Sequence, residues 1–476
     1  MVPAPDRLGR VAGRMGAPVV VMSNRGPLSF TATAEGQWKG RRGGGGLVVT
    51  LGPGVERSGA LWLASAVSDG DRQAAAQGLV ESDGFRLQSL VVDPDVYRGY
   101  YDVVANGSLW YALHGLWDLP RRPRFDRRWH EAWASYVAVN RRFAAAAAEA
   151  AGPGATVLVQ DYQLALVPSF LAGARPDLDI TTFVHTPWCS PAELAVLPDA
   201  VGRQVLEGLA GSAAVGFHSR RWARAFAACC EEVLGRCPPT FVAPAAPDAA
   251  DISRVADGAA CADAHRQLGA EVGERVFVVR VDRIDLSKNV LRGFHAFDEL
   301  LAAREDLRGR VVFGAFVYPS RQSLADYLSY SQEVQALARF VNTRWATPDW
   351  TPILLHADDD HPRSVAALRR ADVALVNPLR DGLNLVAKEL ALVNERDAAL
   401  VLSRHAGCAD ELGQHALVIN PFDVSATAAA LGRAIDMAPE ERTQRFAAMR
   451  AVVEARTAVD WFGDLLGAAG VRRPGR

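Results

Sequence analysis

The stretch NPLRDGLNLVAKEL, residues 377–390, places an arginine, an aspartate and a glycine directly after the apolar run ADVALV. A helical pattern begins at Leu385 and continues through Val386 to Glu389. The amides at the start of a helix and the helix dipole both favour negative charge, so Leu385 and Val386 predict a site for an anionic ligand. Glu389, one helical turn further on, is then placed to accept hydrogen bonds from ligand hydroxyls.

Other residues of this turn have competing interpretations. Gly382 permits an unusual backbone angle, as a specialised binding turn often requires. The alternative is an ordinary helix start that is capped by Asn384. In that case Lys388 and Glu389 lie on a solvated face of the helix.

A second candidate is the loop DRIDLSK, which follows the apolar run VFVVRV. Arg283 and Lys288 are two cations five positions apart on one strand-to-helix loop, an arrangement that suits a leaving diphosphate. The alternative is a pair of solvated charges neutralised by Asp282 and Asp285. The position of the loop after a buried strand favours the functional interpretation.

The remaining candidates are weaker when each is taken alone. His185 and Asp161 follow apolar runs, where a satisfied structural residue is common. Arg25 and Arg321 are single basic residues in loops. The run RRGGGGL (41–47) lacks a following Lys-Ser or Lys-Thr and the third glycine of the dinucleotide motif, so a flexible turn is favoured over a diphosphate loop.

These candidates need elements to position them, and strand-like runs alternate with amphipathic stretches along the chain. Helical patterns cover 127–151 and 289–304, and the alternation predicts an α/β doubly wound architecture. Ligands of such sheets bind beyond the carboxyl ends of the strands, where the candidate residues stand. Nearly continuous apolar runs predict buried parallel strands at VVVM (19–22), TVLVQ (156–160), TTFVH (181–185), VFVVRV (276–281), RVVFGAFV (310–317), DVALV (372–376) and ALVLS (399–403).

The length of 476 residues exceeds what one hydrophobic core usually supports, so two domains are expected. The stretch PPTFVAPAAPDAADISRVADG is rich in Pro, Ala and Asp and lacks periodicity, which places the boundary near 240–260. We expect domains over 1–245 and 246–455. Residues 456–476 are expected to form a helix and tail that pack back on the first domain.

Composition argues against several classes of function. The net charge of −2, from 52 basic and 54 acidic residues, is untypical of a nucleic-acid binder. The chain shows no signal peptide and no run of roughly 20 apolar residues, so no membrane partner and a cytoplasmic location are expected. The six cysteines lack C-x-x-C spacing, and DDD (358–360) is interpreted as a solvated loop, so no metal site is predicted.

The loops resemble those of the trehalose-6-phosphate synthase family, retaining glycosyltransferases with two facing Rossmann-like domains of the GT-B type. The similarity extends from about residue 19 to about residue 423. The matching segments are VVVMSNRGP, GGGGL, YYDVVANGSLWYALH, VLVQDYQLALVP, FVHTPW, VGFHS, DRIDLSKN, PSR, DWTPILLH, NPLRDGLNLVAKE and INPFD.

The resemblance implies a role for each candidate residue. The positions that hold the glucose 6-phosphate acceptor match Arg25, Tyr101, Trp110 and Arg321. Asp161 matches the acidic residue near the acceptor, and His185 matches the residue that touches the donor sugar. The donor positions match Gly45 and Gly46 (near the diphosphate), Arg283 and Lys288 (the diphosphate clamp), Asp381, Gly382, Leu383 and Asn384 (around the transferred glucose), and Leu385, Val386 and Glu389 (amide and ribose contacts).

The resemblance also implies an acceptor-binding N-terminal domain and a nucleotide-sugar-binding C-terminal domain. The partners are then small-molecule substrates, and no cofactor is needed. No metal is required where Arg283, Lys288 and the helix amides neutralise the diphosphate. The sequence leaves open whether the chain forms a homo-oligomer.

Two features bear on the base of the donor. The stretch LVNERDA (392–398) is similar to one in the pseudoglycosyltransferase branch that makes validoxylamine 7′-phosphate and uses a guanosine donor. Asn377 stands where many relatives have Thr, and an amide offers a donor and an acceptor to a purine edge. Both features favour GDP-glucose over UDP-glucose.

That branch departs from the family's glycine pair and from its R-D-G-x-N-L-V turn, and this chain retains both. We therefore expect ordinary glucose transfer to glucose 6-phosphate. The alternatives are a pseudoglycosyltransferase that couples an aminocyclitol phosphate and a catalytically silent sugar-nucleotide sensor.

Overall fold

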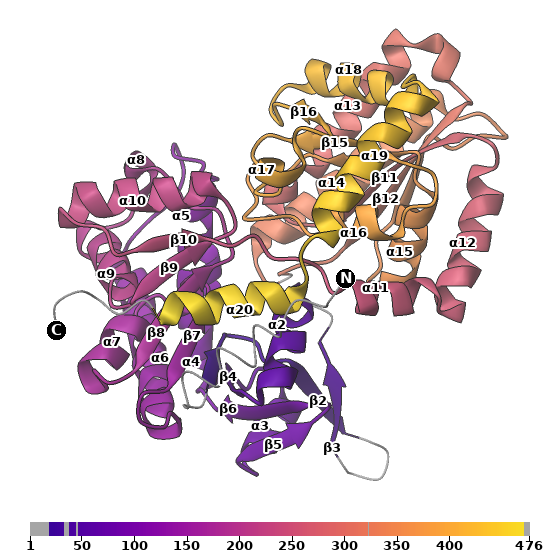
Figure 1. Ribbon diagram of the computed structural model, residues 1–476. Coiled ribbons are helices and arrows are strands. Elements are labelled where there is room, and N and C mark those ends of the chain that lie inside the picture. Colours follow the sequence, from indigo (N-terminus) through magenta and orange to yellow (C-terminus); the bar gives the residue numbers. More distant parts are fainter. Residues whose placement is uncertain (1–18, 33–37, 44–45, 322, 471–476) are drawn as a thin grey trace. The chain divides into compact units, whose positions relative to one another are not determined.

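Two separate sheets organise the chain in the computed structural model, which describes residues 19–32, 38–43, 46–321 and 323–470 (Figure 1). Contacts divide the chain into unit 1, Met1–Ala245 with Ala458–Arg476, and unit 2, Ala246–Thr457. Each unit combines a largely parallel sheet with helices, so the predicted α/β class is confirmed.

Unit 1 contains an eight-stranded sheet of order β10-β9-β8-β7-β1-β4-β6-β5, in which only β5 runs antiparallel to its neighbour. The antiparallel pair β2 and β3 forms a separate two-stranded sheet, which falls between β1 and β4 in the sequence. The strands are β1 Val19–Met22, β2 Leu28–Ala32, β3 Trp38–Arg42, β4 Leu61–Ser65, β5 Leu79–Ser82, β6 Phe85–Leu90, β7 Thr156–Gln160, β8 Asp179–Val184, β9 Ala214–Phe217 and β10 Thr240–Val242.

The helices of unit 1 include the last helix of the chain, α20, which packs on α2 and on β7 and β8 (Figure 1). The helices are α2 Gly46–Ser58, α3 Asp69–Ala75, α4 Pro94–Arg98, the π-helix η1 Gly99–Leu109, α5 Trp110–His114, α6 Arg127–Ala150, η2 Tyr162–Leu164, α7 Val167–Ala174, α8 Pro191–Leu194, α9 Asp199–Leu209, α10 Arg220–Leu234 and α20 Ala458–Ala469.

Unit 2 is built on a six-stranded, fully parallel sheet of order β13-β12-β11-β14-β15-β16. Every residue of β14 and β15 is buried, as expected for strands covered on both faces. The strands are β11 Val276–Arg283, β12 Val311–Tyr318, β13 Ile353–His356, β14 Val373–Val376, β15 Ala399–Ser403 and β16 Leu417–Ile419.

The helices of unit 2 lie before, between and after these strands in the chain. They are α11 Ala249–Ala256, α12 Ala259–Val272, η3 Leu286–Lys288, α13 Val290–Ala303, η4 Glu305–Leu307, α14 Ala325–Trp345, α15 His361–Arg370, α16 Val386–Val393, α17 Ala409–Leu412, α18 Val424–Ile435 and α19 Pro439–Glu454.

Candidate active site

The strand order of each sheet identifies where a ligand is expected. In unit 2 the order reverses between β11 and β14, and in unit 1 it reverses between β1 and β7. Connections leave in opposite directions at such a point, so a crevice forms beyond the carboxyl ends of the two strands. The loops at these ends contain most of the predicted site residues.

Lys288 and Asp381 meet beyond the ends of β11 and β14. The Lys288 ammonium lies 2.5 Å from Asp381 Oδ2 and 4.0 Å from Asp282 Oδ1. Burial disfavours the ammonium, but these two carboxylates outweigh that effect and raise the pKa of Lys288. Lys288 is therefore a permanent cation at the switch point of the sheet.

Arg280 supports this cation from within the sheet. Its side chain is fully buried in β11, and its guanidinium donates to Asp282 Oδ2 at 2.7 Å and to the Lys288 carbonyl at 2.9 Å. The sequence prediction did not include Arg280. The available signal was a charged residue inside the apolar run VFVVRV.

Asp285 is a buried acid that brings two predicted cations together. Its Oδ2 lies 3.4 Å from Arg321 Nη1 and 4.0 Å from Arg283 Nη2. Its Oδ1 accepts from the Ser287 amide and hydroxyl, at 3.0 and 2.9 Å. Arg283 and Arg321 thus belong to one cluster of unit 2, and Arg283 keeps nearly half of its side chain exposed.

The turn after β14 differs from its predicted backbone. The left-handed residue is Asn384, with φ of 80°, whereas Gly382 does not have a positive φ, so that prediction was wrong. The Asn384 side chain accepts from the Ala387 amide at 3.2 Å and donates to Asp381 Oδ2 at 3.2 Å. Asn384 therefore caps the helix start and also orients the Asp381 carboxylate.

Leu385 and Val386 lie at the start of α16, as the helical pattern predicts. The first amides of a helix have no acceptors within it, so this end of α16 favours an anion. Leu383 is buried in the same turn, and its carbonyl accepts from the Cys408 amide at 2.8 Å.

Lys388 does not lie on a solvated face of this helix. Lys388 is only 3% exposed, and its ammonium lies 2.7 Å from Glu411 Oε2 in α17, so it ties two helices together. Glu389 keeps part of its side chain exposed. Desolvation of its carboxyl group, with a smaller effect of Asp251, raises the pKa of Glu389 to about 7. The solvated-face alternative is wrong for Lys388.

Of the two features used to predict the donor base, Asn377 directly follows β14 but is buried, and 392–398 lies at the other end of the sheet. Asn377 is 1% exposed, and its amide donates to the Asn289 carbonyl at 3.3 Å. The stretch 392–398 connects α16 to β15, at the amino end of that strand. Asn394 there donates to the carbonyls of Leu368 and Ala371 at 2.7 and 2.9 Å. Neither feature is placed to read a base by direct contact.

In unit 1, Asp161 and His185 follow the adjacent strands β7 and β8. Asp161 has φ 70° and ψ 170°, a conformation that side-chain-bearing residues rarely adopt. Its Oδ1 accepts from the amides of Tyr162 and His185 at 3.0 and 3.2 Å. The strained residue is thus fixed by both strand ends, a pattern common at functional sites.

Both ring nitrogens of His185 have hydrogen-bond partners. Nε2 lies 2.9 Å from Gln160 Oε1 and Nδ1 lies 3.2 Å from His218 Nε2. Burial lowers the pKa of His185 to about 3, so the ring is neutral. The sequence prediction did not include Gln160 and His218, although both are polar residues at ends of apolar runs.

The predicted acceptor residues of unit 1 lie on different elements. Arg25 follows β1 and is exposed, and Tyr101 on η1 stacks on Tyr97 with a ring separation of 5.3 Å. Trp110 begins α5, is 2% exposed and stacks on His114 at 4.2 Å. Trp110 therefore offers a ligand little surface, whereas Arg25 and Tyr101 remain accessible in part.

The glycine pair is only half described. Gly46 is exposed at the first position of α2, and Gly45 lies outside the described residues.

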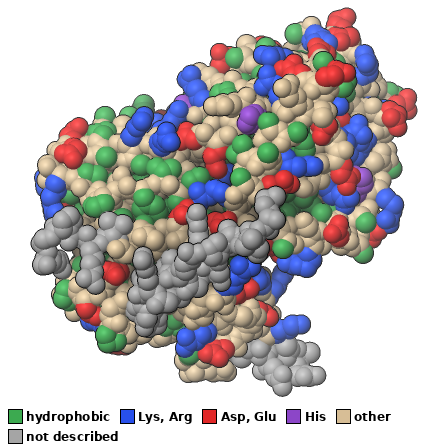
Figure 2. Space-filling model, in the orientation of Figure 1, with side chains coloured by type: hydrophobic (Ala, Val, Ile, Leu, Met, Phe, Trp, Pro, Cys, Tyr) green, Lys and Arg blue, Asp and Glu red, His purple; other side chains and the backbone are tan. Residues whose placement is uncertain are grey.

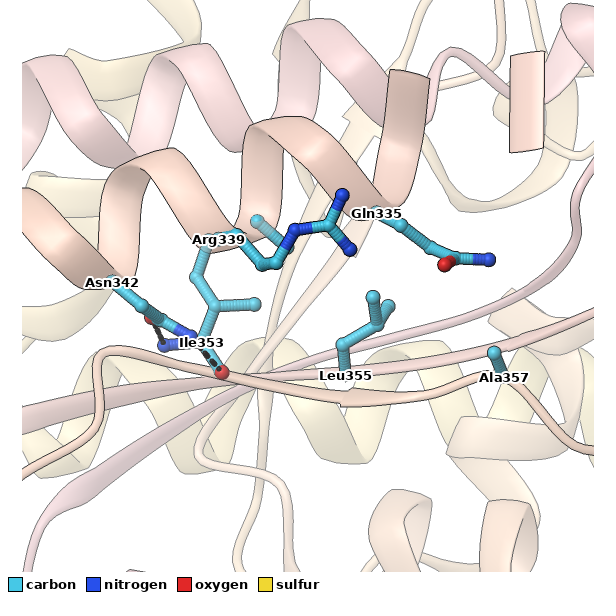
Figure 3. Close-up of a pocket in the computed structure, with 7 residues that line it drawn as sticks. Gln335, Arg339, Asn342, Ile353, Leu355 and Ala357 are labelled. Atoms are coloured by element: carbon cyan, nitrogen blue, oxygen red, sulfur yellow. Dashed lines mark hydrogen bonds between the residues drawn. The ribbon is translucent and has the colours of Figure 1, made fainter. Parts of the chain in front are cut away.

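Other surface features do not coincide with these residues. A cavity of about 410 Å³ lies between α14 and β13 (Figure 3). Arg339 and Leu355 line it, and the Asn342 side chain forms hydrogen bonds with the backbone of Ile353.

On the face shown in Figure 2, acidic and basic side chains are interspersed. Within the described ranges, no cluster of three His, Cys, Asp or Glu is arranged for a metal ion. None of the helices described is long and apolar enough to cross a membrane.

The model of glycosyltransferase family 20 matches residues 17–469. The chain belongs to glycosyltransferase family 20. Among curated relatives of this family, the trehalose-6-phosphate synthases of Mycolicibacterium vanbaalenii and Mycolicibacterium smegmatis are each 34% identical, over 96% and 95% of this chain and 97% and 92% of theirs.

Solved structures of the family share the GT-B fold. An E. coli structure bound with UDP-2-fluoro glucose has a TM-score of 0.83 at 27% identity and covers 96% of this chain and 99% of its own. A UDP-forming synthase from Burkholderia xenovorans in complex with glucose-6-phosphate has a TM-score of 0.82 at 27% identity, over 95% and 100% of the two chains. The predicted family, fold and glycosyltransferase class are confirmed.

Proposed function

We propose that the chain transfers glucose from a nucleoside diphosphate glucose to glucose 6-phosphate and forms trehalose 6-phosphate. The donor is assigned to unit 2 and the acceptor sugar mainly to Arg25, Tyr101 and Asp161 of unit 1. The names of the relatives and the ligands of the two solved structures support this assignment.

The observation that carries the proposal is the charge arrangement at the switch point of unit 2. Lys288, the half-exposed Arg283 and the start of α16 stand at the carboxyl ends of neighbouring strands β11 and β14. Two cations and a helix N-terminus are suited to a diphosphate, whose negative charge grows as the sugar leaves. Glu389 on the same helix offers oxygens to ribose hydroxyls.

We assign a retaining reaction without a covalent enzyme intermediate, in which the acceptor attacks on the face from which the diphosphate departs. The acceptor hydroxyl oxygen bonds to the anomeric carbon while the bond from that carbon to the diphosphate oxygen breaks. The electron pair stays on the diphosphate oxygen, which also takes the hydroxyl proton. Asp381 is a poor candidate for a covalent nucleophile, because its carboxylate is already paired with Lys288 at 2.5 Å and with Asn384 at 3.2 Å.

A donor panel tests the reaction. The enzyme is incubated with each of several nucleoside diphosphate glucoses and either glucose 6-phosphate or an aminocyclitol phosphate as acceptor. The product is read by mass and by cleavage with an α,α-trehalose-specific hydrolase after phosphate removal. A disaccharide phosphate of the expected mass supports the proposal. Donor binding without product would favour the silent sensor, and product only with an aminocyclitol phosphate would favour the pseudoglycosyltransferase.

The preference for GDP-glucose over UDP-glucose stays a prediction. It now depends on the likeness of 392–398 to a guanosine-using branch, since Asn377 is buried. A tenfold preference needs only about 1.4 kcal/mol, which one or two hydrogen bonds supply. Competition between the two donors at equal concentration measures it, and faster use of UDP-glucose would contradict it.

A further inference from the structure

Four buried or half-buried groups of unit 1 form one hydrogen-bond chain. The Ala245 amide lies 3.3 Å from His218 Nδ1, His218 Nε2 lies 3.2 Å from His185 Nδ1, and His185 Nε2 lies 2.9 Å from Gln160 Oε1. Gln160 ends β7, His185 follows β8 and His218 follows β9, so the chain runs across three adjacent strand ends.

The direction of every bond in the chain follows from its first donor. A backbone N–H only donates, so His218 Nδ1 accepts and the proton of the neutral His218 ring is on Nε2. His218 then donates to His185 Nδ1, which leaves the His185 proton on Nε2, facing the Gln160 oxygen. A single backbone amide thus determines the tautomers of two rings and the orientation of one side-chain amide.

Aromatic packing holds the two rings in place. Trp461 of α20 is fully buried and stacks on His218 at 6.2 Å and 28°, while its edge packs on His185 at 5.8 Å. The Trp461 indole donates to the Ala243 carbonyl at 2.9 Å, two residues before the amide that starts the chain. Rotation of either ring would break this packing as well as the hydrogen bonds.

We infer that His218 is a positioning residue of the transfer reaction, which fixes His185 as an Nε2–H hydrogen-bond donor. The inference rests on the proposed function for the contact between His185 and the substrate. Because His218 fills Nδ1, the only donor of the His185 ring is Nε2–H, which donates to Gln160 Oε1 and which a sugar oxygen would share with, or take over from, Gln160. His185 is then no general base, in agreement with the lowered pKa of its buried ring.

Two variants of one position separate this role from simple packing. Gln carries one donor and one acceptor on a flexible chain of similar reach, whereas Met has similar size and neither strong donor nor acceptor. We expect His218→Met to lower kcat about 10-fold to 100-fold, as expected for a misplaced catalytic contact, with a much smaller change in KM. His218→Gln should recover most of the lost kcat.

Nitrogen NMR of histidine-labelled enzyme reads the tautomer directly, with the His185 signal identified by His185→Asn. Wild type and His218→Gln should show a protonated Nε2 and an unprotonated Nδ1 on His185, and His218→Met should show a mixture. A protonated Nδ1 in wild type, or equal kcat in the Met and Gln variants, would overturn the inference. If His218→Met does not fold, the wild-type spectrum still shows which nitrogen of His185 carries the proton. That result does not depend on whether glucosyl transfer is found.

Discussion

Lys288 and Arg283 carry the same charge on one loop but lie in different surroundings. The Lys288 side chain is 15% exposed beside two carboxylates, whereas the Arg283 side chain is 45% exposed. We expect Arg283→Ala to lower kcat about 10²–10³-fold, the usual effect of losing a transition-state charge contact, with little change in melting temperature. Steady-state kinetics and thermal unfolding of the same preparation measure both.

Lys288→Ala should affect stability as well as turnover. It leaves the Asp381 and Asp282 carboxylates without their shared cation, and breaking a buried pair costs on the order of 3–5 kcal/mol. Arg127→Ala is the matched control, because that side chain is 92% exposed and its pair with Glu131 is on the surface.

Normal turnover in Arg283→Ala would remove Arg283 from the mechanism.

Glu389 makes the stability of unit 2 depend on pH. Its folded-state pKa of about 7 exceeds the ordinary value, so the folded chain holds a proton that the unfolded chain releases. The free energy of unfolding should therefore fall as pH rises from about 4.5 to about 7 and change little from this group above that.

Glu389→Gln should raise the melting temperature at pH 8 and leave it nearly unchanged at pH 5. The reason is that glutamine resembles the protonated acid at both values. Thermal unfolding of both proteins across this range is the measurement. Parallel pH profiles of the two proteins would show that Glu389 does not carry the effect.

The positions of the predicted site residues follow from the sequence where the local pattern itself determines their surroundings. Arg283 ends the buried strand β11 and Lys288 lies five residues after it, so that strand alone places both at the sheet edge. Lys388 has its partner Glu411 in another helix, so its helical position gave no sign of burial. Asn377 is likewise enclosed by the distant Asn289, which no local pattern reveals.

At the scale of elements, the close packing of α2 on α20 depends on one glycine. A Cβ added at Gly54 would lie 2.3 Å from Phe462 Cγ and 2.5 Å from its Cβ. Gly54→Ala should destabilise unit 1 by about 1–3 kcal/mol, because the two helices would have to separate. Chemical denaturation and limited proteolysis near residue 456 report on that separation.

Gly467→Ala on α20 is the control for helix propensity. No atom lies within 4 Å of the added Cβ, so this change should stabilise the protein by about 0.5–1 kcal/mol. The opposite sign of two Gly-to-Ala changes within one helix pair isolates the effect of packing. Equal effects of the two substitutions would contradict it.

The elements themselves were predicted unevenly. The bounds of β1, β7 and β15 match their apolar runs, and α6 and α13 match their helical patterns to within one residue at each end. β9 was missed because its four residues include Gly216, a residue that weakens a strand signal. Its glycine is required by packing, since an added Cβ would lie 2.4 Å from Phe241 and 2.5 Å from Phe183.

At the scale of the whole molecule, the two units differ in whether one continuous segment of the chain forms them. Unit 2 is one segment, Ala246–Thr457, whereas unit 1 combines Met1–Ala245 with Ala458–Arg476. We expect residues 246–457 to fold alone with cooperative unfolding. Residues 1–245 should not, because the fully buried Trp461 and Phe462 of α20 would be missing.

Circular dichroism and denaturant titration of the two fragments test this difference. A synthetic peptide of residues 456–470, added to fragment 1–245, should restore cooperative unfolding by supplying α20. A peptide in which Trp461 and Phe462 are replaced by alanine is the control. Cooperative unfolding of 1–245 without any peptide would contradict the expectation.

The same discontinuity sets a delay during protein synthesis. The strands that α20 covers are complete before residue 246 is made, but α20 leaves the ribosome only after all of unit 2. At about 5–20 residues per second, that interval is on the order of 10–40 s. Throughout it, the nascent unit 1 exposes the apolar surface that surrounds Phe183, and such surface is what holding chaperones bind. Helix α20 therefore determines how long β7 and β8 depend on such chaperones.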